Sequence, residues 1–158
     1  MASFVFNIAL GRVAELYRRV EENSPANSAL VLVAINNGGT SDATMQDYTT
    51  LAALLADAGV AEVTNSGYTR RVLTDAELAA VPAPDNTNNR IELSLPAVTW
   101  AAIAAGTAWT DLVVCYDPDT TTGTDADLIP LTLSDFVKTP DGGDIPMAAG
   151  VFFRANAA

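Results

Sequence analysis

The run Ala29-Leu30-Val31-Leu32-Val33-Ala34-Ile35 is continuously apolar and has the length of a strand. Such runs are typical of strands that are covered on both faces. Turn-forming residues flank it, because residues 23–28 read Asn-Ser-Pro-Ala-Asn-Ser and residues 36–40 read Asn-Asn-Gly-Gly-Thr. The strand must therefore begin and end within these limits. We predict that residues 29–35 form the central strand of the fold.

The segment before this run predicts a strand and then a helix. Residues 3–10 alternate in the period-two pattern of a strand with one strongly apolar face. The apolar positions of that strand are Phe4, Phe6, Ile8 and Leu10. Gly11 interrupts the pattern, and apolar residues then recur at helical spacing over residues 12–22, which is about three turns. Glu15 and Arg19 form a favourable pair one turn apart on this helix.

The segment after the central strand predicts a second helix, a hairpin and a short third helix. Ser41 or Asp42 can cap a helix that continues to residue 58, and Gly59 is well placed to end it. Two strand-like segments, residues 60–64 and 68–73, flank an Asn-Ser-Gly turn and predict a hairpin. Residues 74–77 then read Thr-Asp-Ala-Glu, a capping-box pattern that opens a short helix through residue 80.

The second half of the chain has the character of a β structure. Turn chemistry fills residues 84–89, and the segments that follow are short and strand-like. The expected strands are residues 91–95, 111–116, 128–133 and 151–154. Pro130 is typical of an edge strand or a bulge, so we expect one of these at residues 128–133. Residues 101–106 are compatible with either a helix or a strand.

These elements together predict the fold class. We expect one α+β domain over residues 1–158, mostly antiparallel β-sheet with about six to eight short strands and a sandwich- or barrel-like second half. Two to three helices lie in the first half. Residues 1–10 have a second interpretation, as a strand arm that contacts a neighbouring subunit.

Composition argues against several functions. The net charge is −11 and the sequence pI is about 4.1, which leaves little cationic surface for nucleic acid and would repel anionic membranes. The chain has no histidine and one cysteine, so the usual serine and cysteine catalytic arrangements and the cysteine- and histidine-rich zinc sites cannot form. Cys115 lies in an apolar run and is expected to be an inert packing residue. We therefore expect neither an enzyme nor a bound cofactor or metal.

One polar segment could still bind calcium. Residues 117–127 read Asp-Pro-Asp-Thr-Thr-Thr-Gly-Thr-Asp-Ala-Asp, which offers the hard oxygen ligands that calcium prefers. An EF-hand loop needs glycine at its sixth position and glutamate at its twelfth, where this chain has Thr122 and Leu128. A solvated turn between two strands is the expected structure. A calcium-dependent module that binds surface carbohydrate is the alternative.

Aromatic and apolar residues mark both ends of the chain. The candidate interface residues are Phe4, Phe6, Ile8, Phe152 and Phe153. One interpretation places two terminal strands in the core of the domain. The other makes one end an arm that adds to, or exchanges with, a neighbouring subunit.

Several segments resemble small structural proteins of tailed bacteriophages and prophages. They are residues 4–9 (Phe-Val-Phe-Asn-Ile-Ala) with 11–13 (Gly-Arg-Val), 24–30 (Ser-Pro-Ala-Asn-Ser-Ala-Leu), 73–75 (Leu-Thr-Asp), 84–90 (Pro-Asp-Asn-Thr-Asn-Asn-Arg), 113–117 (Val-Val-Cys-Tyr-Asp) and 150–154 (Gly-Val-Phe-Phe-Arg). The resemblance spans nearly the whole chain and rests on packing and turn segments, so it carries over no catalytic or ligand residue.

The resemblance implies a virion component that is made in the host cytoplasm. The expected role is a capsid decoration, or cement, protein that binds the major capsid protein on the outer surface of the head. A homo-oligomer is expected, with a trimer as the first choice because shells offer local threefold positions. The alternative virion role is a tail or head-to-tail joining protein, in which the helix at residues 12–22 would line a ring interface.

Overall fold

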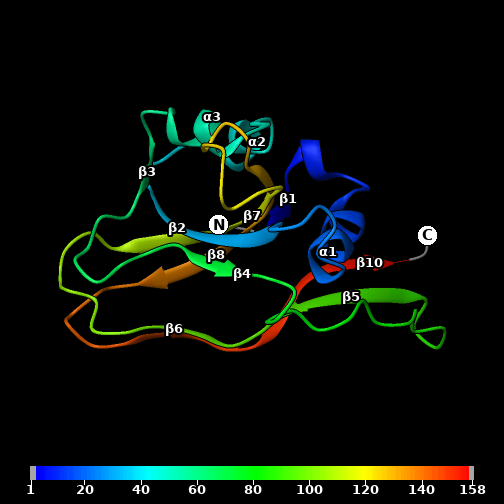
Figure 1. Cartoon of the computed structure of the whole chain (residues 1–158). Helices are drawn as coiled ribbons and strands as arrows, with labels where there is room; N and C mark the ends of the chain where they lie inside the picture. The colour runs from blue at the N-terminus through cyan, green and yellow to red at the C-terminus, as the bar shows by residue number, and fades with distance from the viewer. Residues whose placement is uncertain (1–2, 157–158) are drawn as a thin grey trace.

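A computed structural model describes residues 3–156 of the chain (Figure 1). The helical elements are η1 (Asn7–Ala9, a 3-10 turn), α1 (Val13–Glu21), α2 (Asp42–Met45) and α3 (Leu51–Leu55). The strands are β1 (Phe4–Val5), β2 (Ala29–Asn37), β3 (Val60–Glu62), β4 (Arg71–Leu73), β5 (Arg90–Leu95), β6 (Val98–Trp100), β7 (Trp109–Asp117), β8 (Ile129–Lys138), β9 (Ile145–Met147) and β10 (Gly150–Asn156). The pairings are antiparallel, and the domain is of the α+β class, as the sequence predicts.

The central strand is the one that the apolar run predicts. β2 pairs with β7 along one edge, and its other edge pairs with β4 near its start and with β3 near its end. The main sheet has the order β1-β8-β7-β2-β3, with β4 also on β2. Residues 29–35 are all buried, because both faces of the sheet are covered.

The two faces of β2 belong to two different clusters of buried side chains. Leu30, Leu32 and Ala34 face the first core, which also holds the apolar side of α1 and the fully buried Trp100 and Trp109. The alternate residues of the same strand, Val31, Val33 and Ile35, face the second core under α2 and α3. Figure 1 shows these two short helices on one side of the sheet and β5, β6 and β10 on the other.

Two small two-stranded ribbons complete the structure. β6 pairs with β9, and β5 pairs with β10. The β5–β10 ribbon extends sideways from the main sheet, beside α1 and toward the C-terminus (Figure 1). Tyr17 of α1 joins it to the first core, since its ring stacks on Phe152 at a centroid distance of 6.0 Å and its hydroxyl donates a hydrogen bond to the Ser94 carbonyl.

The first predicted helix is confirmed, and the second is split. α1 buries Val13, Leu16, Tyr17 and Val20, the residues that carry its apolar spacing. The predicted helix from residue 41 or 42 to 58 is instead two short helices. Ser41 caps the first and Thr50 caps the second, each through a side-chain oxygen that accepts a backbone N–H bond, so the chain restarts a helix at Thr50.

Three further predictions need correction. Residues 3–10 do not form one strand, because only Phe4 and Val5 pair with β8 before the chain turns into η1. The predicted hairpin is wrong, because β3 and β4 both pair with β2 and not with each other. Residues 74–77 form the capping-box hydrogen bonds between Thr74 and Glu77, but the chain makes only a turn there and no helix.

Two local features of the second half agree with its sequence. Pro130 lies at a bulge. It is opposite Cys115 of β7, and the pairing register of β7 with β8 shifts from Val114 to Cys115. Residues 101–106 adopt neither of the two structures considered and run as irregular chain between β6 and β7.

Candidate functional site

Residues from both ends of the chain surround one small hollow. We call it the terminal hollow; it measures about 120 Å³. Its lining residues are Ser3, Phe4, Val5, Thr132, Leu133, Ser134, Phe152, Phe153 and Arg154. β1 brings Phe4 there because it pairs with β8 at Leu133, and β10 brings the other two aromatic rings. The first and last strands, which are far apart in the sequence, thus both contribute to one hollow beside β8.

The five residues predicted for an interface differ in exposure. Phe6 is fully buried in the second core, where its ring contacts that of Phe4 edge-on at 5.1 Å. Phe4, Ile8, Phe152 and Phe153 are half-buried. The structure brings Phe4, Phe152 and Phe153 to the terminal hollow, whereas Ile8 lies in η1 against the second core. Their contact with a neighbouring subunit stays a prediction, and Phe6 has no exposed surface to contribute to it.

The segment proposed for a strand arm is folded onto its own chain over residues 3–10. Residues 1–2 of that prediction lie outside the described residues. Phe6 donates a backbone hydrogen bond to the Leu131 carbonyl, and Asn7 donates one to the Gln46 carbonyl. Leu10, at the end of the segment, is 62% exposed.

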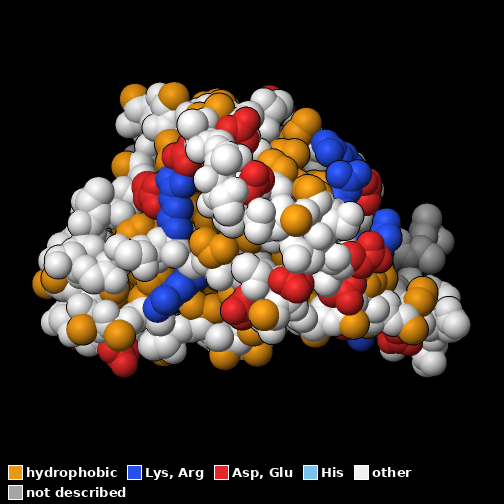
Figure 2. Space-filling view, viewed as in Figure 1, with side chains coloured by type: hydrophobic (Ala, Val, Ile, Leu, Met, Phe, Trp, Pro, Cys, Tyr) orange, Lys and Arg blue, Asp and Glu red, His pale blue; other side chains and the backbone are white. Residues whose placement is uncertain are grey.

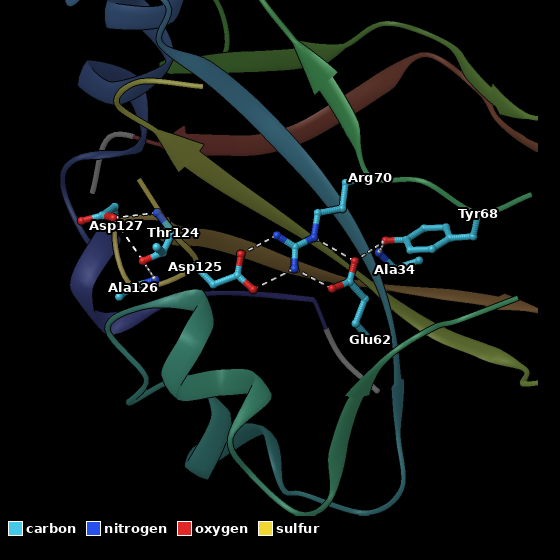
Figure 3. A network of polar contacts seen from close by, with 8 residues as sticks. All are labelled: Ala34, Glu62, Tyr68, Arg70, Thr124, Asp125, Ala126 and Asp127. Atoms are coloured by element: carbon cyan, nitrogen blue, oxygen red, sulfur yellow. Dashed lines mark hydrogen bonds and ion pairs between the residues drawn. The ribbon is translucent and has the colours of Figure 1, made fainter. Parts of the chain in front are cut away.

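The acidic loop at residues 117–127 is held by an arginine that the sequence analysis did not identify. Arg70 forms two bonds to Glu62, at 2.8 and 2.5 Å, and two to Asp125, at 2.5 and 2.8 Å (Figure 3). Both carboxylates are bound in the fork geometry that makes arginine pairs strong. We call this group the Arg70 clamp. No pattern around the Arg-Arg pair at residues 70–71 indicates which acids it would meet.

The clamp is embedded in further polar contacts. Tyr68 donates its hydroxyl proton to Glu62 and accepts the backbone N–H of Ala34 in β2 (Figure 3). Burial raises the pKa of Tyr68, and the nearby Glu62 raises it further. Arg70 holds the pKa of Asp125 below its ordinary value, because the guanidinium binds the charged form of the carboxyl. The loop thereby gains a fixed attachment to β2, β3 and the segment before β4.

The other carboxylates of the loop have local partners. Asp119 accepts the hydroxyls of Thr121 and Thr122, and Asp127 accepts the backbone N–H of Thr124. Asp117 accepts the backbone N–H of Asp119, and burial raises the pKa of its carboxyl. Within residues 3–156 no group of three acidic or thiol side chains is placed to hold a metal ion. The loop is built as a set of turns around its own hydroxyls and Arg70.

The loop also supports α3 directly. The backbone N–H groups of Leu51 and Ala52, in the first turn of that helix, donate to the carbonyls of Leu128 and Asp125. These are among the N–H groups that a helix start leaves without internal partners. Releasing the loop would therefore expose the start of α3 as well as the clamp.

Two buried groups show unusual surroundings. Asp111 is 1% exposed, and its Oδ1 has no hydrogen-bond partner, while Oδ2 accepts the Thr110 hydroxyl. Burial raises the pKa of Asp111, and Asp135, directly opposite on β8, adds to that shift. Cys115 is fully buried, and burial raises the pKa of its thiol, in agreement with an inert cysteine.

Charge is unevenly distributed over the surface. Figure 2 shows acidic side chains across most of one face, with basic side chains gathered beside α1 and in a second group on the opposite side of that view. Of the cations on α1, Arg18 pairs with Glu22 and Arg19 pairs with Glu15 of the same helix. Among the described helices none is long and apolar enough to cross a membrane.

Comparison of the chain with protein-family models, with curated proteins and with solved structures found no match.

Proposed function

We propose that this chain is a structural protein of a tailed-bacteriophage virion, and specifically a capsid decoration protein on the outer surface of the head. The resemblance that motivates it spans nearly the whole chain, and it includes the first segment, residues 4–9 with 11–13, and the last, residues 150–154. The observation that carries it in the structure is the meeting of these same two segments around the terminal hollow. Two of the segments that carry the resemblance thus contribute lining residues to one hollow, where half-buried aromatic side chains are available to a partner.

The terminal hollow would act by accepting an apolar group of the major capsid protein. Its aromatic rings are half-buried, so contact with a partner removes further apolar area from water at about 25 cal/mol per Å². A protein that binds the assembled shell and not its free subunits stabilises the shell by mass action. Attachment through folded strands, rather than through a loose arm, avoids the cost of ordering a segment on binding.

Shell binding tests the proposal. Shells of the phage that encodes the chain are assembled without it and then mixed with purified protein. Ser3 is exposed at the rim of the hollow, so Ser3→Trp would occlude the hollow without removing a packed side chain. Ser66→Trp, at an exposed position far along the chain, is the matched control. We expect Ser3→Trp to weaken shell binding by about tenfold or more, as for a central interface position, and Ser66→Trp to bind as the unmodified chain does.

Saturable binding that raises the melting temperature of the shell supports the decoration role. Absence of binding to the shell, or localisation to the tail or neck in labelled micrographs, would overturn it. Binding that Ser3→Trp and Ser66→Trp reduce equally would leave the chain a decoration protein but remove the terminal hollow as its attachment.

A further inference from the structure

The net charge of the chain lies entirely outside one end of the molecule. We call that end the ribbon end: α1 with its flanking residues 12 and 22, the segment 84–95 that contains β5, and β10. It carries five basic and five acidic residues and is neutral. Its basic residues are Arg12, Arg18, Arg19, Arg90 and Arg154; its acidic residues are Glu15, Glu21, Glu22, Asp85 and Glu92. The rest of the chain, the body, carries three basic and fourteen acidic residues, which is the whole net charge of −11.

This division decides how two copies can approach each other. Two bodies repel, because each presents a large excess of carboxylates with few cations. The ribbon end presents both signs side by side, with Arg154 at 2.6 Å from Glu92 and Arg90 at 3.6 Å from Asp85. A surface with balanced charge can face another copy of itself without net repulsion, which a self-complementary contact requires.

The shape of the ribbon end also suits a partner. Along the outer part of β10, residues 154–156 are exposed, and their partner β5 is only half-buried there. The inner part of the ribbon packs on the first core through Leu93 and Leu95, whereas its outer part is half-buried or exposed; a two-stranded ribbon without such packing is only marginally stable in water. Two hollows adjoin it, one of about 280 Å³ between Tyr17 and Arg90 and one of about 400 Å³ between Pro84 and Ala155. A covering partner would therefore bury ribbon surface that the chain itself leaves in water.

We infer that the ribbon end is the surface on which a second copy of this chain docks. Charge balance favours a copy over a basic partner, since a basic partner would bind the acidic body instead. The inference goes beyond shell binding, because the outer part of the ribbon end would hold the two copies together, while the terminal hollow, to which β10 contributes Phe152 and Phe153, would meet the shell. A copy docked there would extend the β5–β10 ribbon or fill its adjoining hollows.

The test is the mass of the chain in solution as a function of protein and salt concentration, by sedimentation. Ala155 lies on the exposed outer part of β10, and Ala61 lies at an exposed position on β3 of the body. Ala155→Asp and Ala61→Asp thus add the same charge to a strand in two places, and both should leave the fold intact, as circular dichroism would verify. We expect self-association of the unmodified chain, loss of about tenfold or more in affinity for Ala155→Asp, and no comparable loss for Ala61→Asp.

Salt gives a second readout. Screening at high ionic strength weakens repulsion between the acidic bodies, and the Debye length falls from about 10 Å at 0.1 M to about 3 Å at 1 M. Self-association through the neutral end should therefore tighten as salt is added. Association that weakens with salt would show contact between oppositely charged surfaces and would overturn the inference. A chain that stays monomeric at all concentrations, or one that Ala61→Asp disrupts as strongly as Ala155→Asp, would also overturn it.

These outcomes are separable from those of the proposed function. A monomer that still binds shells would refute the ribbon contact alone. An oligomer that Ala155→Asp dissociates but that binds no shell would refute the decoration role and leave the ribbon contact standing.

Discussion

Replacing Arg70 with alanine should destabilise the domain far more than removing any surface arginine. The change deletes four hydrogen bonds and leaves Glu62 and Asp125 without their cation. Side-chain exposure is 28% for Arg70, 23% for Glu62 and 37% for Asp125, so the burial of the clamp is intermediate between that of a surface ion pair and that of a buried one. Breaking a buried pair costs about 3–5 kcal/mol and a surface pair less than about 1 kcal/mol.

The expected loss is therefore about 2–3 kcal/mol of unfolding free energy, discounted for solvent screening. For a domain of this size that is a fall of about 4–12 °C in melting temperature. The measurement is denaturant unfolding at neutral pH by circular dichroism. Arg18→Ala is the control, because the Arg18–Glu22 pair lies on the surface at 53% and 49% exposure and its loss should cost no more than about 0.5 kcal/mol.

A double-mutant cycle makes the test specific. With Asp125→Asn in place, Arg70→Ala should cost less, because part of the coupling has already been removed. Arg70 holds the pKa of Asp125 below its ordinary value of 3.8. The stability that this pair contributes is therefore fully present above pH 3.8 and is lost as pH falls through the lowered pKa. Equal destabilisation by Arg70→Ala and Arg18→Ala, or a cycle with no coupling, would refute the clamp as the anchor of the loop.

Three further predictions concern stability and reactivity. Asp111→Asn should raise the free energy of unfolding at neutral pH by about 1 kcal/mol, because it removes a buried charge. The pKa of Asp111 is raised, so the unmodified chain loses stability as pH rises from the ordinary aspartate value of 3.8 through the raised pKa. A variant that is equally stabilised below pH 3.8 would contradict this. Thr50→Ala should cost about 1 kcal/mol in thermal unfolding through loss of the α3 cap, and an unchanged melting temperature would show that the loop carbonyls alone suffice. Cys115 should react with a thiol reagent only at the rate of unfolding, so rapid labelling of the native protein would contradict its burial.

The sequence correctly predicts the elements whose hydrophobic pattern reflects which of their faces are buried. The run at residues 29–35 is apolar at every position because both faces are covered, and α1 has an apolar stripe because one face packs on the sheet. Hydrophobic periodicity therefore sufficed for both, and for the four longer strands of the second half, but not for the three-residue strands β6 and β9, which lie outside the predicted strands.

The errors arise where two structures share one pattern. Residues 4–10 alternate like a strand, yet the chain turns at Asn7. The side-chain amide of Asn7 donates a hydrogen bond to Asp47 at 2.6 Å, and no local sequence pattern predicts this contact. The segments around β3 and β4 have the composition of a hairpin, but each pairs with β2, and nothing in their own sequence indicates that partner. The split at Thr50 reflects a cap that competes with helix continuation.

The candidate site was predictable only as a list of residues. Composition pointed to the aromatic residues near both ends, but their meeting around one hollow depends on the pairing of β1 with β8 and on the place of β10 beside them. Pairing between distant strands is set by the whole sheet and not by the sequence next to Phe4 or Phe153. The Arg70 clamp was missed for the same reason, since Asp125 lies far from Arg70 along the chain.

Electron cryomicroscopy of purified phage particles would locate this chain in the virion. We predict density for this chain on the outer face of the head, with residues 3–5 and the rings of Phe152 and Phe153 against the shell and the outer part of the ribbon end, from residue 154 of β10 and residues 84–92, turned toward a second copy. Density at the tail or neck, or heads without the chain, would contradict it.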